Sequence, residues 1–483
     1  AIPAGARTEG LIVFGTIEEG NGANGFERVV DLGSGHERTI ETQGLAASQH
    51  GYDGQFWNFF NGAGGTTDMP SAVADRRAER WIRQSAWRIA GQPGEERRTV
   101  SLAQTSRIDL TFDPRTRHIA TASYDGDYGP VTFKFDDWQR SGDHVYPGRL
   151  ERNSDLDGRR VELARSVRFL SQVDPNLLSR PTSRPDAPRI EGAATVPLKF
   201  VGERRTHISV PAHINGTPAE LIFDTGAANI LTIEAADRLH VRSSGGINIG
   251  GVGEGTDAGG FGLVNRVSVG AASLDDQSFL IIPSPFPPTN GKPSELAGAL
   301  GFEFLAHYVT TIDYAAGSIT FRESVPPDQP GTRLPFVADG HAIAVTAEVN
   351  GNPVLLRLDT GDGGTVTFFP AYTAATGLDR NAGAVKVVGG GAGGNVRGSS
   401  GRIERFTLGG VEFENLPVQF SKNRAGAFAS RSLAGNLGAS VLQCFRITFD
   451  YPNHRLWLEP RLGAPQCRAV SARPSQAKPT AAQ

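Results

Sequence analysis

The C-terminal half of this 483-residue chain contains one long pattern twice, and this duplication is the strongest constraint on its fold. The segment HINGTPAELIFDTGAANI (213–230) matches EVNGNPVLLRLDTGDGGT (348–365), and each copy has Asn-Gly nine positions before an Asp-Thr-Gly triplet. Further along, LAGALGFEFLAHYVTTIDYAAGSITF (296–321) matches LAGNLGASVLQCFRITFDYPNHRLWL (433–458). A repeat of this length predicts a duplicated domain, because solenoid units are much shorter.

The spacing inside the two copies is also the same. From Asp224 to Gly301 is 77 residues, and from Asp359 to Gly438 is 79 residues. A single Asp-Thr-Gly triplet in a chain with 60 glycines is weak support for any function. Two triplets at equivalent places in one shared pattern are much stronger support, because chance does not preserve the surrounding spacing.

Composition excludes two classes of protein. The formal net charge of −3 leaves no basic excess, so the chain lacks the electrostatic footprint of a nucleic-acid-binding protein. No run of 18 apolar residues is present, so no membrane span is predicted. The sequence begins at Ala1 and has a single methionine, Met69, which suggests an exported precursor whose signal peptide has been removed, although recombinant expression gives the same start.

The two cysteines, Cys444 and Cys467, are candidates for a disulfide. In the segment FRITFD, Phe445, Ile447 and Phe449 alternate as the inward face of a strand, which predicts that Cys444 lies on the opposite, more accessible face. A bridge to Cys467 would hold the tail against the last lobe and add on the order of 3 kcal/mol. The alternative is two unpaired thiols, and export favours the bridge.

The chain divides into five segments by composition and pattern. Residues 1 to about 180 predict an antiparallel β domain with hairpins at 107–124 and 131–150 and one helix, because apolar residues recur at helical spacing from Val73 to Ile89. The remaining segments are a Pro-rich linker (181–193), two lobes (194–325 and 331–460) and a Pro-, Ala- and Ser-rich tail (461–483). The tail is predicted to be disordered apart from a tether at Cys467.

Each repeat brings an Asp to the end of an apolar strand, in AELIFDTG and VLLRLDTG. Thr225 and Thr360 are predicted to hydrogen-bond across a pseudo-symmetric interface, and the following glycines, Gly226 and Gly361, permit close backbone approach. If the lobes face each other, Asp224 and Asp359 cannot both ionise, so they share one proton. The ionised member can then activate a water while the protonated member binds a substrate carbonyl.

At these residues the chain resembles pepsin/retropepsin-type aspartic proteases, in the retropepsin-like form common in bacteria, over about 194–460. The signature is Asp-Thr-Gly followed some eighty residues later by hydrophobic-hydrophobic-Gly. The second element is Ala299-Leu300-Gly301 in one repeat and Asn436-Leu437-Gly438 in the other. The resemblance implies that Asp224 and Asp359 are catalytic, that these segments and the Thr-Gly pairs support them, and that a polypeptide is hydrolysed without cofactor. One chain supplies both halves, so a monomer is one expectation, while the oligomeric state stays open.

Two departures from the family pattern concern the residues that follow each triplet. The pepsin-like Ser after the Gly is replaced by Ala227 in one repeat and by Asp362 in the other. Asp362 is either a third carboxylate that perturbs the pair or meets a basic substrate side chain, or a solvated turn residue. In addition, no Tyr lies between Asp224 and Tyr308, so the pepsin flap tyrosine has no counterpart.

Two Gly-rich stretches, 248–262 and 387–401, are candidates for flaps that close over an extended peptide, and flexible surface loops are the alternative. The candidate flap glycines are Gly251, Gly253, Gly390 and Gly391. The second stretch satisfies G-x-G-x-x-G, but the next apolar run alternates as a strand, so a dinucleotide site is not predicted. The ten histidines show no H-E-x-x-H spacing and G-x-S-x-G is missing, so no metal or serine nucleophile is predicted.

The N-terminal domain resembles the curved half-barrel of LolA-like bacterial periplasmic proteins in VVDLGSG (29–35), GYDGQFW (51–57) and FKFDDWQRSGDHVYPGRL (133–150). This resemblance implies a binding or propeptide-like module, and a packing scaffold is the alternative. The complete prediction is a mainly β protein, with an antiparallel LolA-like half-barrel and two pseudo-symmetric acid-protease-like β-barrel lobes, in the periplasm or secreted. The rival functions are a non-catalytic carrier of lipid or peptide and an enzyme inhibited by its first domain.

Overall fold

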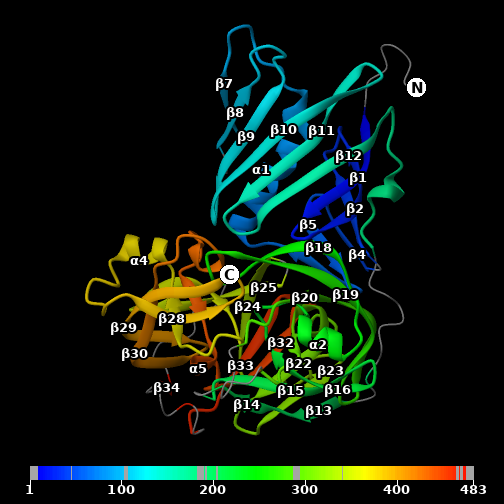
Figure 1. The fold of residues 1–483 in the computed structure, drawn as a ribbon. Helices are drawn as coiled ribbons and strands as arrows, with labels where there is room; N and C mark the ends of the chain where they lie inside the picture. Colours follow the sequence, from blue (N-terminus) through cyan, green and yellow to red (C-terminus); the bar gives the residue numbers. More distant parts are fainter. Residues whose placement is uncertain are drawn as a thin grey trace.

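The computed structural model is mainly β, as the sequence predicts (Figure 1). It describes residues 9–44, 46–102, 107–181, 190, 193–202, 205–286, 294–339, 341–463, 467 and 472–474. Most of the predicted linker 181–193 lies outside this part of the chain. Among the described residues, none of the helices has both the length and the apolar character needed to cross a membrane.

Twelve of the described strands form one antiparallel sheet in the N-terminal part (Figure 1). In spatial order they are β6 (Ala63–Thr67), β5 (Phe56–Phe60), β4 (Ala46–Tyr52), β3 (Glu37–Gln43), β2 (Gly22–Asp31), β1 (Gly10–Glu19), β12 (Gly158–Leu170), β11 (His144–Ser154), β10 (Gly129–Ser141), β9 (Ile119–Gly126), β8 (Arg107–Phe112) and β7 (Arg97–Ser101). The predicted hairpins are β8–β9 and β10–β11.

The predicted N-terminal helix is confirmed as α1 (Pro70–Ser85), which continues into η1 (Ala86–Arg88). Pro70 occupies the first turn, where its missing N–H is no loss. Ala78 and Ile82 are fully buried, and they belong to a core cluster with Phe133 of the sheet. The apolar stripe of the helix therefore packs on the sheet. Because this packing needs apolar residues at helical spacing, the helix could be predicted from the sequence.

The first repeat forms a sheet of eight described strands. In spatial order they are β14 (Lys199–Val201), β15 (His207–Ile214), β16 (Thr217–Phe223), β21 (Gly298–Leu300), β17 (Ile230–Thr232), β20 (Ala272–Ile282), β19 (Thr256–Val269) and β18 (Ser243–Gly250). Its helices are α2 (Ile233–Arg238) and α3 (Phe302–Leu305).

The second repeat forms a larger sheet that also takes strands from the first. In spatial order, its described strands are β13 (Ala193–Pro197), β23 (Ser318–Arg322), β22 (Val309–Asp313), β32 (Phe445–Asp450), β33 (Arg455–Pro460), β24 (Thr332–Asp339), β25 (Ala342–Val349), β26 (Asn352–Leu358), β31 (Gly435–Leu437), β27 (Val366–Phe368), β30 (Val411–Ser421), β29 (Gly394–Leu408) and β28 (Lys386–Gly391), and β34 (Ala472–Pro474) pairs with β30 outside this order. The short helices are α4 (Pro370–Thr376), η3 (Ala427–Ala429), α5 (Ala439–Leu442) and η4 (Tyr451–Asn453), and η2 (Pro175–Leu178) precedes the lobes.

The two repeats meet where β22 pairs with β32, with Ile312 opposite Ile447. Both residues are fully buried and belong to one core cluster that runs through both lobes. The element order also repeats, since β16, β17, α2, the hairpin β18–β19, β20, β21 and α3 are answered by β26, β27, α4, the hairpin β28–β29, β30, β31 and α5. The duplication in sequence is therefore a duplication in structure. The precise domain boundaries stay predictions.

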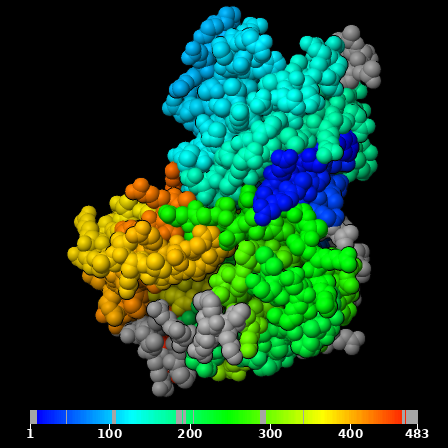
Figure 2. All heavy atoms as spheres, in the orientation of Figure 1, coloured from blue at the N-terminus to red at the C-terminus, as the bar shows by residue number. Residues whose placement is uncertain are grey.

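The N-terminal sheet sits on the two lobes, and its main contact with the first lobe is β18 (Figures 1 and 2). Asn24 of β2 exchanges two hydrogen bonds with the backbone of Gly246, at 2.7 and 3.1 Å. On the second lobe, the Asp127 carboxylate accepts hydrogen bonds from Ser430 Oγ and from the backbone N–H of Ser432. The N-terminal sheet is thus held to both lobes by polar contacts.

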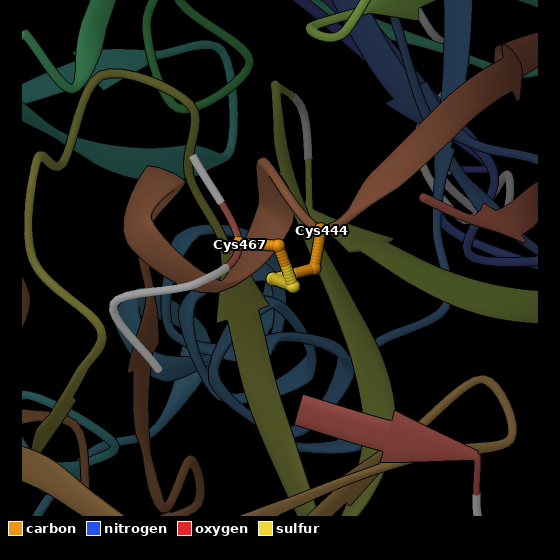
Figure 3. Close-up of a disulfide and its surroundings, with 2 residues drawn as sticks. All are labelled: Cys444 and Cys467. Carbon is orange, nitrogen blue, oxygen red and sulfur yellow. A yellow bond between two sulfur atoms is a disulfide. The ribbon is translucent and has the colours of Figure 1, made fainter. Parts of the chain in front are cut away.

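The disulfide prediction is confirmed, because Cys444 and Cys467 are bonded, with their Cα atoms 4.7 Å apart (Figure 3). The prediction that Cys444 lies on an accessible face is wrong, since its exposed fraction is 0%. The reason is that β32 is covered on both faces, so that Thr448 is as deeply buried as Phe449. Strand alternation separates inside from outside only where one face meets solvent.

The prediction of a disordered tail is wrong at one place. Residues Ala472–Pro474 form β34, which pairs antiparallel with β30. Cys467 lies a few residues upstream and is part of the core cluster of the lobes. Cys467 and β34 thus both lie against the second lobe.

We expect the Cys467→Ser variant to lose about 3 kcal/mol of unfolding free energy, because the bridge closes a loop with a sequence separation of 23 residues. Urea unfolding followed by tryptophan fluorescence measures the loss. Reductant should lower the midpoint of the parent protein and leave that of the variant unchanged. Equal midpoints for parent and variant would contradict the expectation.

Candidate active site

Both Asp-Thr-Gly loops begin where an apolar strand ends. β16 ends at Phe223 and β26 at Leu358, and the backbone N–H groups of the following Asp224 and Asp359 bond to the carbonyls of Leu300 (3.1 Å) and Leu437. β21 lies between β16 and β17, parallel to the first and antiparallel to the second, and β31 lies in the same way between β26 and β27. The hydrophobic-hydrophobic-Gly segments thus pass behind the two loops.

The two loops are joined by hydrogen bonds between their threonines. Thr225 N–H donates to Thr360 Oγ1 at 3.0 Å, and Thr360 N–H donates to Thr225 Oγ1 at 3.1 Å. The Thr360 hydroxyl donates onward to the carbonyl of Phe223, and the Thr225 hydroxyl to that of Leu358. Both threonines have an exposed fraction of 0%. These crossed bonds fix the position of one lobe's loop against the other.

Each glycine of the triplets lies against the carboxylate of the other lobe. A Cβ added to Gly226 would lie 2.8 Å from the Asp359 carboxyl, and one added to Gly361 would overlap the Asp224 carboxyl. Backbone also fills the space beside Gly301 and Gly438, which face carbonyls of their own loops. The predicted site residues of the two triplets are therefore brought together, and their glycines are required by close approach.

Two carboxyls of the site, those of Asp224 and Asp362, have raised pKa values. Burial and the neighbouring charge of Asp359 raise the pKa of Asp224 well above its ordinary value. Burial and the same Asp359 charge raise the pKa of Asp362 to about 6. The protonated form of Asp224 is therefore favoured beside Asp359, as one half of a shared-proton pair requires.

Three buried side chains lie behind the loops and were not predicted as functional residues from the sequence. In the first lobe, Asn229 Oδ1 accepts from Gly301 N–H at 2.9 Å, and Asn229 N–H donates to Glu303 Oε2 at 2.6 Å. In the second lobe, Asn436 Nδ2 donates to Asp359 Oδ2 at 3.0 Å. The only signal in the sequence was the polar residue at the first position of Asn436-Leu437-Gly438.

The two flap candidates are hairpins, and their tips touch. β18 and β19 form flap 1, and β28 and β29 form flap 2. Gly253 N–H donates to the carbonyl of Ala392 at 3.1 Å, and Gly255 N–H donates to that of Gly393 at 2.9 Å. The Gly251 carbonyl accepts from Ala427 N–H in the loop before β31. The flap tips are therefore closed on each other.

Of the other flap candidates, Gly391 faces Val252 of flap 1, while Gly390 lies against its own hairpin partner Asn395. The glycines of 387–401 lie in the hairpin of β28 and β29, so a strand and not a helix follows them. In the part of the chain that the structure describes, His, Cys, Asp and Glu side chains form no group of three or more that could hold a metal ion.

Comparison with known proteins agrees with the repeat. The family model of aspartyl proteases matches residues 210–304 and 345–441, which include both triplets and both flaps. This match supports an aspartyl-protease-like family for the duplicated half. No curated protein matches the chain in sequence. The bacterial type and the LolA-like resemblance of the N-terminal sheet stay predictions.

Among solved structures, two seed proteins are similar over about half of this chain. Basic 7S globulin from soybean has 12% identity and a TM-score of 0.36, covering 56% of this chain and 98% of its own. Conglutin gamma, a unique basic 7S globulin from lupine seeds, has 10% identity and a TM-score of 0.36, and the match covers 59% of this chain and 99% of conglutin gamma. Likeness at this level carries no argument about function.

We expect Glu303→Gln to change the pH dependence of stability. Burial raises the pKa of Glu303 to about 7, so its contribution is fully present below the ordinary value of 4.5 and is lost as pH rises through about 7. The glutamine keeps an acceptor for Asn229 N–H and cannot ionise. The free energy of unfolding, measured with urea at pH 5 and pH 8, should rise in the variant relative to the parent by on the order of 3 kcal/mol between the two pH values. A difference in unfolding free energy between variant and parent that is equal at both pH values would contradict this expectation.

Proposed function

We propose that this protein is an aspartic endopeptidase that hydrolyses peptide bonds with a water activated by Asp224 and Asp359. The observation that supports this best is the crossed contact of the two Asp-Thr-Gly loops, in which each glycine abuts the opposite carboxylate. A pair of carboxyls in contact, with one ionised and one protonated, is the arrangement that general acid–base hydrolysis of an amide needs.

In the proposed reaction, the ionised carboxylate takes a proton from the water while the water oxygen attacks the peptide carbonyl. The protonated carboxyl donates its hydrogen bond to the carbonyl oxygen and stabilises the tetrahedral intermediate. The closed flaps support an extended polypeptide as the substrate, because a strand inserted beneath two hairpins can bond to their backbone. The proposed chemistry uses no cofactor.

The disulfide supports a compartment outside the cytoplasm, because such bonds persist where conditions are oxidising. We propose a periplasmic or secreted location on this ground. The proposed domain division remains an N-terminal β domain (1–180), two protease lobes (194–325 and 331–460) and a tail.

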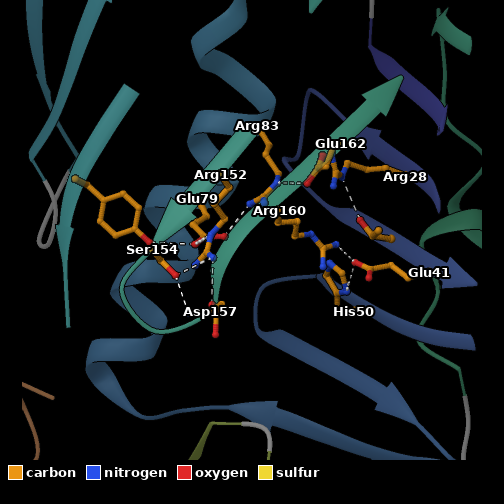
Figure 4. A network of polar contacts seen from close by, with 12 residues as sticks. Arg28, Glu41, His50, Glu79, Arg83, Arg152, Ser154, Asp157, Arg160 and Glu162 are labelled. Carbon is orange, nitrogen blue, oxygen red and sulfur yellow. Dashed lines mark hydrogen bonds and ion pairs between the residues drawn. The ribbon is translucent and has the colours of Figure 1, made fainter. Parts of the chain in front are cut away.

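The rival function, a carrier of lipid or peptide in the N-terminal half-barrel, has weaker support. The cavity there has a volume of about 420 Å³, and charged side chains line much of it (Figure 4). Arg28 and Arg83 pair with Glu162 at 2.8 and 3.1 Å, and Arg152 pairs with Glu79 at 2.8 Å. An acyl chain needs an apolar lining, and placing one here would bury these charges without water.

We expect Asp224→Asn and Asp359→Asn each to lower kcat for cleavage of an unfolded protein by on the order of 10³-fold or more, because each removes one half of the acid–base pair. The amide keeps the shape of the side chain, so circular dichroism and the unfolding midpoint report whether the fold is retained. A folded variant of either kind that cleaves at the parent rate would refute the assigned roles.

We further propose that the N-terminal domain restrains flap 1. Besides the Asn24–Gly246 pair, Asn248 N–H of β18 donates to Glu19 Oε1, and the Asn248 side chain donates to the carbonyl of Arg159 at 2.6 Å. Met69, 4% exposed, belongs to an apolar cluster with flap 2 residue Val396, and Val252 at the tip of flap 1 packs against it. Opening of the flaps would therefore break contacts with the N-terminal domain.

We expect Asn24→Ala to raise kcat/KM on a peptide substrate by about tenfold, because it removes two hydrogen bonds that hold flap 1 closed. Asn61→Gly is the matched control, since Asn61 makes an equivalent pair of bonds to Ser278 on β20 rather than to β18, and glycine suits its positive φ of 53°. An unchanged kcat/KM in Asn24→Ala, or an equal rise in both variants, would contradict restraint through the flap.

A further inference from the structure

The two carboxylates of the pair receive different numbers of hydrogen-bond donors. Asp359 Oδ1 accepts from the backbone N–H groups of Gly361 (2.9 Å) and Asp362 (3.1 Å), and its Oδ2 accepts from Asn436 Nδ2 (3.0 Å). Among the described residues, Asp224 accepts one such bond, from Gly226 N–H at 2.8 Å, besides its contact with Asp359. Each donor stabilises the ionised form of a carboxyl group. The hydrogen bonding therefore favours a negative charge on Asp359.

The repeats differ at two positions beside the carboxyls, and at the first of them the second lobe gains a side-chain donor. The residue before Leu-Gly is Ala299 in β21 and Asn436 in β31, and the residue after Asp-Thr-Gly is Ala227 in the first loop and Asp362 in the second. An alanine side chain has no donor. The donor that the missing Ser would supply beside Asp359 comes instead from Asn436, and the first lobe has no equivalent side chain.

Asn436 has a fixed orientation because it contacts two carboxyls. Its Nδ2 also donates to Asp362 Oδ2 at 2.9 Å, so both N–H bonds of the amide are used. Turning the amide over would place its oxygen against both carboxyls, which repel it. Asn436 Oδ1 is buried and has no hydrogen-bond partner among the described residues, although such an atom is costly to bury. The Asn436 oxygen thus stays unpaired while the amide N–H groups point at the two carboxyls.

We infer that Asn436, held in place by Asp362, is a positioning residue that favours ionisation of Asp359, so that Asp359 is the base and Asp224 the acid. This inference rests on the proposed function. Water gives one proton to Asp359 as its oxygen bonds to the carbonyl carbon. The carbonyl π electrons move to its oxygen, which takes the proton of Asp224. The product of this step is a neutral geminal diol, and the two aspartates have exchanged protonation states.

Asn436 and Asp362 have opposite effects on pH dependence. Loss of the Asn436 donor destabilises ionised Asp359, so the acid limb of activity moves to higher pH. Asp362, whose pKa is about 6, is ionised above that pH, and its negative charge helps the pair to keep its shared proton. Loss of Asp362 therefore moves the alkaline limb to lower pH.

Other ionisable groups also act on the pair, but they stay the same in every variant. Burial lowers the pKa of His207 and of His341, both of which feel the charge of Asp359. Burial raises the pKa of Tyr451, which feels the charge of Asp224. Differences between the pH profiles therefore report on the substituted positions.

The test compares pH profiles of kcat and kcat/KM on a peptide chosen from a peptide-library digest by the parent protein. Asn436→Ala and Asp362→Ala give the second lobe the residues of the first. We expect the acid limb of Asn436→Ala to rise by about one pH unit and the alkaline limb of Asp362→Ala to fall. Asn436→Asp keeps the shape of the side chain and should also raise the acid limb.

The control is Ser440→Ala, which removes a hydrogen bond of 2.9 Å to the carbonyl of Gly363 in the same loop without touching a carboxyl. It should lower the unfolding midpoint and leave both limbs in place. Limbs that do not move in a folded Asn436 variant, or that move equally in Ser440→Ala, would overturn the inference. A parent protein that cleaves no substrate at any pH would instead refute the proposed function, so the two failures are distinguishable.

Discussion

The crossed hydrogen bonds between Thr225 and Thr360 are the constraint on which the rest of the duplicated half depends. Each threonine uses its backbone N–H and its hydroxyl on the other loop, so neither loop can shift without breaking bonds in both lobes. Since these groups are fully buried, water cannot replace the lost bonds, and the penalty for separation is high. This contact holds two carboxyls together that would otherwise repel each other.

The backbone of the two repeats is nearly symmetric, whereas the side chains around the carboxyls are not. Equivalent strands pass behind equivalent loops, because that geometry is set by sheet pairing and by glycines with no room for a side chain. In the inferred assignment, Asn436 makes the pair unequal, because Ala299 at the same place in the first repeat has no side-chain donor. A duplicated fold can therefore keep its support in common and give different roles to its two halves.

We propose that the N-terminal domain acts on the site through packing rather than through its cavity. Arginines and carboxylates that line the cavity are paired with each other, and an apolar ligand there would take these pairs out of contact with water (Figure 4). The edges of this domain meet β18 and the apolar cluster at the flap tips. In this proposal, the domain affects the reaction by limiting the motion of the flaps.

The sequence by itself determined the features that local pattern and repetition encode. Apolar spacing from Val73 to Ile89 gave a helix, and the two Asp-Thr-Gly strands gave a pair of facing loops. The structure alone decided the contacts between segments far apart in the chain. Cys444 is buried because both faces of β32 are covered, and Asn436 reaches Asp359 because β31 passes behind the loop. Periodicity specifies how one element is built, but burial and hydrogen bonding depend on which other elements pack against it.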